Sequence, residues 1–219
     1  GLIGSGKTTL ASQIFGLDPN SKVKMTLNGD AYKPKSPKEA IAAGVFMCPK
    51  DRASNAVVSE FDISNNLALP FLKRHSRLTF LRSKSLAQNA RNSINKLGIV
   101  CQSEMDSVTT LSGGNQQKVM VGRWLAEESS VLLLYEPFQG VDINARRDIG
   151  IQIRSTSSQR ATLIFVAELD EALEIADRVI VLHEGNLVGE YQNKSKNIPE
   201  IVSSFSGSTF NPDSSNYGT

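Results

Sequence analysis

The sequence predicts an α/β fold in which a mostly parallel sheet is flanked by helices. Three short, continuous apolar runs, at 131–134, 163–166 and 179–182, suit parallel strands that are buried on both faces. Helical patterns separate these runs, and a glycine-rich loop at the start of the chain leads into a further helix. Strands that alternate with helices in this order are typical of layered α/β domains.

Length and composition favour a single globular domain. The 219 residues are 40% hydrophobic and 21% charged, with a net charge of +2 that is too small to predict binding to nucleic acid. No apolar run approaches the roughly 20 residues that cross a bilayer, and we expect no signal peptide. Any role at a membrane is therefore expected to be peripheral and to depend on a partner. The two cysteines, Cys48 and Cys101, are expected to be free thiols.

The first 50 residues predict short elements. A helix is expected over 7–15, directly after the glycine-rich loop. Residues 22–27 alternate apolar and polar side chains ahead of an Asn-Gly turn at 28–29, which predicts a strand at the edge of a small sheet. A short helix is expected over 37–43, and a short buried strand over 45–47.

The middle of the chain carries a helical pattern. Apolar residues recur there at spacings of three and four, as one face of a helix requires. They are Leu86, Ala90, Ile94 and Leu97. We interpret residues of about 60–110 as a helical subdomain inserted between the strands.

Further helices are expected over 116–127, 144–154 and 171–176. All these elements are expected to form one nucleotide-binding domain over residues 1–205. Serine, glycine and asparagine dominate 206–219, which predicts a flexible tail.

The segment from Gly1 to Thr8, GLIGSGKT, matches the phosphate-loop pattern G-x-x-x-x-G-K-[ST]. Its glycines let successive backbone N–H groups surround phosphate oxygens, while the following helix presents its positive N-terminus. Lys7 is expected to reach the β- and γ-phosphates, and the Thr8 hydroxyl is expected to bind Mg²⁺. Alone, the motif indicates a nucleoside triphosphatase of unspecified kind. Candidate nucleotide-binding residues are Gly1, Gly4, Ser5, Gly6, Lys7, Thr8 and Thr9.

The position of this motif within the sequence is unusual. A phosphate loop needs a preceding strand to orient its backbone, yet Gly1 is already its first residue. We therefore expect a truncated sequence that is missing its first strands, one of which would be central in the sheet.

A second helix start follows more than 100 residues later, in the segment 111–118, LSGGNQQK. Ser112 is a good N-cap, and the two glycines after it allow close backbone approach. The start of this helix suits an anion, and a domain that already has a phosphate loop would use it for a nucleotide bound elsewhere. Its candidate nucleotide-binding residues are Ser112, Gly113, Gly114 and Asn115. Pairs four residues apart on its buried side are Met120 with Trp124 and Val121 with Leu125.

This segment resembles the signature of ABC transporter ATP-binding domains, and its N-Q-Q-K form resembles the branch that imports ribose, galactose and xylose. The other motifs of that family have counterparts in the expected order over about residues 1–205. They are a Walker B strand at 131–137, a D-loop at 139–142, a switch region at 165–171, a closing strand at 177–185 and a Q-loop position at 47–52.

The resemblance implies an ATPase that binds ATP and Mg²⁺ and drives a membrane permease, with a periplasmic sugar-binding protein as an indirect partner and no role for nucleic acid. It implies a peripheral position on the cytoplasmic face of the inner (plasma) membrane. In this family two such domains pair head to tail, and each ATP lies between the phosphate loop of one and the signature of the other. Glu136 would orient the attacking water. The helical subdomain would contact the permease, with 51–69 at the hinge.

Three positions depart from the pattern of the family. Tyr135 replaces the Walker B aspartate, which accepts a hydrogen bond from a Mg²⁺-bound water. The loss of such a partner typically costs about 10–100-fold in metal affinity or activity. Ala167 replaces the switch histidine, and Lys50 replaces the Q-loop glutamine. The last two departures resemble the second, C-terminal, ATP-binding domain of tandem sugar importers.

These departures predict an asymmetric pair of sites. The site built on Lys7 is expected to bind ATP weakly and to hydrolyse it poorly. The site that the signature at Ser112 completes on a partner is expected to remain competent, because its motif is intact.

Two alternatives remain. The chain could be a degenerate, non-catalytic ABC domain that acts as a structural half, as Tyr135 and the missing first strands favour. It could also be a soluble ABC ATPase of DNA repair or translation, although the short insert shows no sustained heptads. Of the isolated residues, we expect His75 to lie on the surface, His183 to be structural without metal-ligand spacing, and Trp124 to pack in the core.

Overall fold

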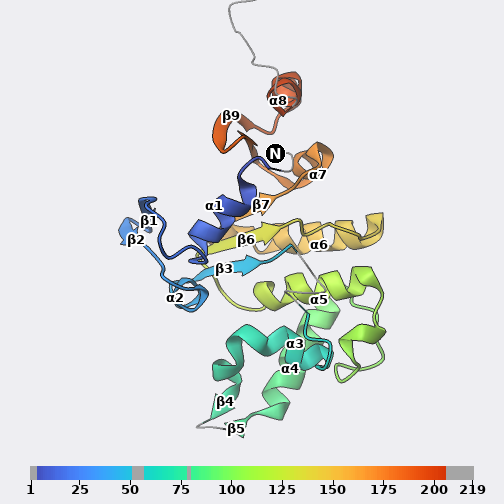
Figure 1. Ribbon diagram of the computed structural model, residues 1–219. Coiled ribbons are helices and arrows are strands. Elements are labelled where there is room, and N and C mark those ends of the chain that lie inside the picture. The colour runs from blue at the N-terminus through green and yellow to red at the C-terminus, as the bar shows by residue number, and fades with distance from the viewer. Residues whose placement is uncertain (1–3, 51–56, 78–79, 206–219) are drawn as a thin grey trace, which may run out of the picture.

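The computed structural model of the chain describes residues 4–50, 57–77 and 80–205. Gly1, Asp51, Arg52 and the expected tail over 206–219 lie outside the described residues. A strand ahead of Gly1 would lie outside the sequence, so the structure does not test that expectation. Figure 1 shows a central sheet between a helical part at one end and a hairpin with a helix at the other.

A parallel sheet of three strands, in the order β3-β6-β7, forms the centre of the molecule. These strands are β3 (Val45–Cys48), β6 (Val131–Tyr135) and β7 (Ala161–Phe165). Every residue of β3 and all but the first of β6 are buried, as continuous apolar runs predict. The predicted α/β fold class is confirmed.

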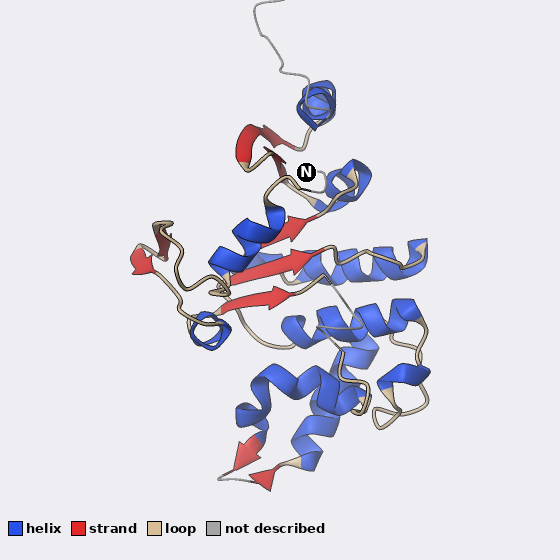
Figure 2. Ribbon diagram, viewed as in Figure 1, coloured by secondary structure: helices blue, strands red, loops and turns tan. Residues whose placement is uncertain are grey.

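Helices cover both faces of this sheet (Figure 2). They are α1 (Lys7–Ile14), α2 (Pro37–Ala42), α5 (Gly113–Leu125), α6 (Ile143–Ser155) and α7 (Leu169–Ile175), with a 3₁₀ turn η4 at Ser157–Gln159. The pleat of β6 divides the core, because successive side chains point to opposite faces. Leu132 and Leu134 join a cluster with residues of α5 and α6, including Trp124, which is buried as expected. Leu133 and Tyr135 join a cluster with residues of α1 and α2.

The helical part lies on the side of β3 and is not one uninterrupted helical run. Its elements are α3 (Ile63–Ala68), η2 (Leu69–His75), a hairpin of β4 (Ser76–Arg77) and β5 (Phe80–Leu81), α4 (Ser83–Leu97) and η3 (Val108–Thr110). Ala90, Ile94 and Leu97 on one face of α4 pack with α3 and α5, as their spacing predicts.

His75 does not lie on the surface, contrary to expectation. Its side chain is buried at the end of η2, and Nδ1 lies 3.0 Å from Ser85 Oγ at the start of α4. The hairpin β4-β5 folds the chain back and brings these two elements together, and a local reading of charged neighbours at 73–74 gave no sign of this packing.

The third apolar run does not join the parallel sheet in the described part of the chain. Strand β8 (Arg178–His183) pairs antiparallel with β9 (Asn186–Gln192). Glu184 and Gly185 both have positive φ, 47° and 80°, which is the backbone of a tight hairpin turn and returns the chain beside β8. A cavity of about 460 Å³, lined by residues of β7 and β8, lies between these two strands. A 3₁₀ turn η5 (Ser195–Asn197) and α8 (Ile198–Phe205) follow.

The predicted edge strand near the N-terminus is confirmed. Strand β1 (Met25–Leu27) and strand β2 (Asp30–Tyr32) form a hairpin whose turn is the expected Asn-Gly pair, with φ of 54° and 93°. None of the helices in the described ranges is long and apolar enough to cross a membrane.

Gly16 ends α1 with φ of 75°, and a Cβ there would lie 2.9 Å from the Ser36 carbonyl oxygen. We expect Gly16→Ala to lower the free energy of unfolding by about 2–4 kcal/mol, since left-handed backbone strain adds to overpacking. Gly29→Ala is the matched control, because Gly29 has positive φ but nothing within 4 Å of such a Cβ, and should cost about 1 kcal/mol. Urea unfolding measures both variants, and equal losses would refute the steric contact.

Candidate nucleotide-binding site

The phosphate loop is attached to the turn between β8 and β9. Gly6 caps α1 with φ of 96°, and the Gly185 backbone N–H donates a 3.0 Å hydrogen bond to the Ser5 carbonyl oxygen. A Cβ at Gly6 would lie only 3.0 Å from Gly185 Cα. A glycine is therefore required at position 6 both by the positive φ and by the close approach of Gly185. The sequence did not reveal this contact.

Lys7 is buried and connects three elements. From the first turn of α1, its Nζ donates to the Val166 carbonyl oxygen at 2.9 Å and to Glu136 Oε1 at 3.3 Å. Glu136 follows β6 and Val166 follows β7, so the parallel strands deliver both acceptors at the same edge of the sheet. A phosphate that binds Lys7 must share Nζ with these acceptors or displace them.

Glu136 is held from both its backbone and its side chain. Its φ is 48°, which is unusual for a residue with a side chain, and its N–H donates to the Phe165 carbonyl oxygen at 2.8 Å. Its Oε2 accepts a hydrogen bond of 3.3 Å from the Ala167 N–H. The carboxylate is therefore fixed beside Lys7. Glu136 is the residue that the family resemblance implies would orient the attacking water.

Tyr135 contacts the residue that was expected to bind metal. Its hydroxyl and Thr8 Oγ1 share a hydrogen bond of 2.7 Å. The Tyr135 ring is buried and stacks on Phe165, with ring centroids 5.7 Å apart and planes 16° from parallel. The cross-strand register that pairs Tyr135 with Phe165 thus holds the phenol against α1.

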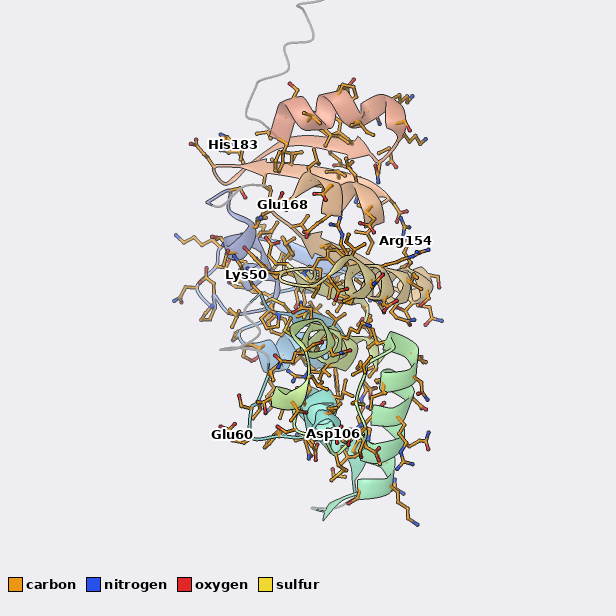
Figure 3. All side chains as sticks on the ribbon, turned by 90° about the vertical axis from the view of Figure 1, so that its right-hand side faces the viewer. Lys50, Glu60, Asp106, Arg154, Glu168 and His183 are labelled. Carbon is orange, nitrogen blue, oxygen red and sulfur yellow. The ribbon has the colours of Figure 1, made fainter. Side chains whose placement is uncertain are left out.

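A cavity of about 590 Å³ opens beside these residues. Lys50 and Glu168 both line it, and Figure 3 shows both in the middle of the molecule, between His183 and the pair Glu60 and Asp106. Burial raises the pKa of the Glu171 carboxyl in this cavity, Arg146 lowers it, and the Glu136 carboxylate raises it further. The lining includes Gly4, Gly6, Lys7, Thr8, Thr9, Lys50, Tyr135, Glu136, Ala167, Glu168 and Glu171.

Ser5 is nine-tenths or more buried within the loop. Its side chain Oγ has no hydrogen-bond partner among the residues that the structure describes. An unpaired buried hydroxyl is costly, so the loop keeps a polar group available for a ligand.

The second predicted helix start is formed as expected. Ser112 Oγ accepts hydrogen bonds from the Asn115 backbone N–H at 3.4 Å and from Asn115 Nδ2 at 3.0 Å. Asn115 Oδ1 accepts a further bond of 3.0 Å from the Val100 N–H. The amide of Asn115 is therefore engaged within its own domain, which sequence reasoning did not anticipate.

Gly114 lies where α5 meets α6. A Cβ there would stand 3.2 Å from Ala145 Cβ, and Gln117 Nε2 donates to the Pro137 carbonyl oxygen at 2.9 Å. The start of α5 is thus fixed to the loop that follows Glu136. Of the described residues that line the Lys7 cavity, none belongs to 112–115, so the two predicted sets do not share one pocket.

A buried polar network behind the site was missed by sequence reasoning. Arg123 of α5 donates from Nε to the Asn66 carbonyl oxygen at 2.6 Å and from Nη2 to Asn66 Oδ1 at 3.1 Å. The Asn66 amide in turn binds both the N–H and the carbonyl oxygen of Val58, each at 3.0 Å. Burial lowers the pKa of Arg123 to about 10. The only sequence signal was an arginine on the apolar side of a helix.

The side chains around Thr8 do not match a ligand set for a divalent cation. Within the described ranges, no cluster of three or more His, Cys, Asp and Glu side chains could hold a metal ion. Thr8 Oγ1 is engaged by Tyr135, and the Glu136 carboxylate is engaged by Lys7 and by the Ala167 N–H. Mg²⁺ prefers carboxylate and hydroxyl oxygens together with retained waters, and the hydroxyl of Thr8 and the carboxylate of Glu136 are both already engaged.

Residues 1–139 match the family model described as ABC transporter. A ribose import ATP-binding protein of Rubrobacter xylanophilus is 36% identical over 208 residues, which are 94% of this chain and 40% of that protein. An arabinose import ATP-binding protein of Rhizobium etli is 36% identical over 189 residues, or 85% of this chain and 38% of that protein. The chain thus spans about two-fifths of the length of these curated relatives.

Solved structures show the same fold. A nucleotide-free ATP-binding cassette from an ABC transporter superposes with a TM-score of 0.76 at 19% identity, covering 92% of this chain and 81% of that one. A dimeric cassette in a post-hydrolysis state, bound to ADP and Pi, gives a TM-score of 0.71 at 17% identity, covering 87% and 82%.

Proposed function

Because this chain belongs to the ABC transporter family, we propose that it is an ATP-binding and hydrolysing subunit that powers sugar import through a membrane permease. One observation carries the proposal: the buried Lys7 of a phosphate loop lies against Glu136 at the edge of a 590 Å³ cavity. That arrangement suits a triphosphate and a water-orienting carboxylate. Sugar as the cargo is supported by the names of the relatives, which import ribose and arabinose.

The proposed unit is a head-to-tail pair of such domains. Gly4, Ser5, Gly6, Lys7, Thr8 and Thr9 would contact the nucleotide of this chain, while Ser112, Gly113, Gly114 and Asn115 would contact the nucleotide of the partner. Support comes from the capped start of α5 outside the Lys7 cavity, and from a relative of the same fold that is dimeric with ADP and Pi.

The permease is the proposed anchor of the pair at the cytoplasmic face of the membrane. The helical subdomain of about 60–110 is its proposed contact, and residues 1–205 are the proposed extent of the domain. A periplasmic sugar-binding protein would be an indirect partner, and nucleic acid has no part.

We further propose that the two sites of the pair are unequal. At the Lys7 site, Tyr135 occupies Thr8 Oγ1, Ala167 offers only its backbone N–H to Glu136, and Lys50 lines the cavity in place of an amide. None of these changes falls within 112–115, the part that this chain would contribute to the partner's site, so Mg²⁺-dependent hydrolysis is assigned to that site.

We expect Ser112→Arg to lower sugar transport by the assembled transporter on the order of 100-fold, because the substituted cation blocks a helix start that receives phosphate. Lys7→Ala should cause a clearly smaller loss, since its site contributes little hydrolysis. Uptake of labelled sugar into vesicles measures both variants, with thermal unfolding to confirm that each is folded. Equal loss of transport from both changes would refute the asymmetry.

A second candidate function is that of a non-catalytic structural half. The hydrogen bond between Tyr135 and Thr8 favours it, because it engages a hydroxyl that catalysis requires. ATP turnover distinguishes the two: a transporter whose turnover is unchanged by Ser112→Arg would contain this chain as a structural half only.

A further inference from the structure

Position 135 is turned toward the phosphate loop by the pleat of β6. Leu133 and Tyr135 point to the face that α1 covers, and Leu132 and Leu134 point to the other. Whatever residue stands at 135 therefore meets the start of α1. A phenol at this place reaches Thr8 Oγ1 at 2.7 Å.

The phenol is not free to leave that place. Tyr135 is 8% exposed, its ring stacks on Phe165, and it belongs to the cluster that α1 covers. Rotation of the side chain away from α1 would break this stacking and the hydrogen bond to Thr8 Oγ1. The hydroxyl of Tyr135 is thus a fixed part of the site.

A cation on Thr8 would need the space that this hydroxyl fills. Mg²⁺ binds oxygen at about 2.0–2.1 Å in an octahedron and keeps several waters. The Tyr135 oxygen stands 2.7 Å from Thr8 Oγ1, inside the region of that water shell. A phenol also adds no negative charge to attract a cation, whereas the carboxylate of Glu136 is already paired with Lys7.

The site has positive groups of its own. Lys7 and Lys50 line the cavity, and the N-terminus of the eight-residue helix α1 points its N–H groups to the same loop. Ser5 Oγ adds a buried hydroxyl that lacks a partner among the described residues. Glu136, Glu168 and Glu171 also line the cavity and oppose an anion, so strong binding is not expected.

From this geometry we infer that the Lys7 site binds a nucleoside triphosphate without requiring Mg²⁺, with Lys50 supplying part of the charge that Mg²⁺ supplies elsewhere. Tyr135 is the residue that removes the dependence on the metal. The inference rests on the proposed function, because it assumes that the loop binds a triphosphate.

The test is nucleotide affinity with and without metal, measured on the intact chain with mant-ATP, a fluorescent ATP, in excess Mg²⁺ and in excess EDTA. The phosphate-loop motif of this chain is the one that includes Lys7, so binding to the chain without a partner reports on this site. We expect the two dissociation constants to agree within about threefold. A tenfold or larger loss of affinity in EDTA would overturn the inference, while no binding in either buffer would instead overturn the proposed function.

Two variants at position 135 identify the group responsible. Tyr135→Asp restores an acceptor for a metal-bound water, so Mg²⁺ should now tighten binding by about 10-fold or more. Tyr135→Phe keeps the stacked ring and removes only the hydroxyl, so it frees Thr8 Oγ1 without adding an acceptor, and Mg²⁺ should tighten its binding clearly less than in Tyr135→Asp. Equal metal dependence in Tyr135→Asp and Tyr135→Phe would refute the role of residue 135.

Lys50→Gln tests the charge compensation without disturbing the core. We expect it to weaken binding in EDTA, and an affinity unchanged by this variant in EDTA would refute the assignment of Lys50. If Tyr135→Asp fails to fold, photolabelling by 8-azido-ATP in the assembled transporter decides the matter. Label on this chain should persist in EDTA, and its loss there would overturn the inference.

Discussion

When Lys7→Met and Glu136→Leu are combined in one chain, we expect the free energy of unfolding to fall by less than the sum of the two single losses. The Lys7 and Glu136 side chains are 7% and 11% exposed and lie 3.3 Å apart. Each single change leaves a buried charge without its partner, at a cost of about 3–5 kcal/mol. The double variant leaves neither charge, so the two losses should overlap by about 2 kcal/mol.

Urea unfolding of the four chains in a double-mutant cycle measures this overlap. Glu136→Gln is a matched control, because an amide oxygen of the same shape can still accept from Lys7 Nζ and should cost less than Glu136→Leu. Additive losses, within about 0.5 kcal/mol, would show that the pair is not energetically coupled.

The second large effect is expected at Arg123. Arg123→Met should lower the free energy of unfolding by about 3 kcal/mol. Hydrogen bonds from a charged donor contribute about 1.5–3 kcal/mol each, and the variant would leave the Asn66 carbonyl oxygen buried without this donor. Arg123 makes two such bonds to Asn66 at 2.6 and 3.1 Å. Methionine keeps much of the apolar stem, so the loss reports on the guanidinium.

Arg154→Met is the control for this prediction. Arg154 pairs with Asp177 at 2.7 Å, but the two side chains are 47% and 84% exposed, so its loss should cost less than about 1 kcal/mol. Hydrogen exchange adds a local measurement: Arg123→Met should speed exchange of the Val58 N–H, which Asn66 Oδ1 holds at 3.0 Å. Equal costs for the two arginine variants would contradict the proposed network.

This network connects α3 and the segment ahead of it to the helix that begins after Ser112. Asn66 binds the backbone of Val58, near the start of the described range 57–77. Arg123 in turn joins Asn66 to α5. The exchange measurement on Val58 tests whether Arg123 holds this segment in place.

Local rules were sufficient wherever the signal lies within a few residues. Ser112 was predicted to cap a helix, and its Oγ accepts from the Asn115 N–H. The apolar run at 131–134 was predicted to be a buried strand, and Val131–Tyr135 is one. The Asn-Gly turn at 28–29 joins two strands. Capping, periodicity and turn chemistry act over one or two turns of chain, so a sequence displays them directly.

Contacts between distant residues were not predictable in the same way. His75 was expected on the surface but is buried against Ser85, because a hairpin folds η2 onto α4. The run at 179–182 was expected in the parallel sheet, but among the described residues it pairs with β9, across the turn at Glu184 and Gly185. A periodic pattern shows that a segment is apolar without showing which neighbour will cover it.

The sequence by itself determined that this chain is an α/β domain with a phosphate loop at Lys7 and a capped second helix start at Ser112. Only the tertiary structure decided that Tyr135 meets Thr8 and that Lys7 meets Glu136, across separations of 127 and 129 residues. The physical reason is that these contacts depend on the side of the sheet to which β6 turns each residue, and on the register that brings Phe165 beside Tyr135.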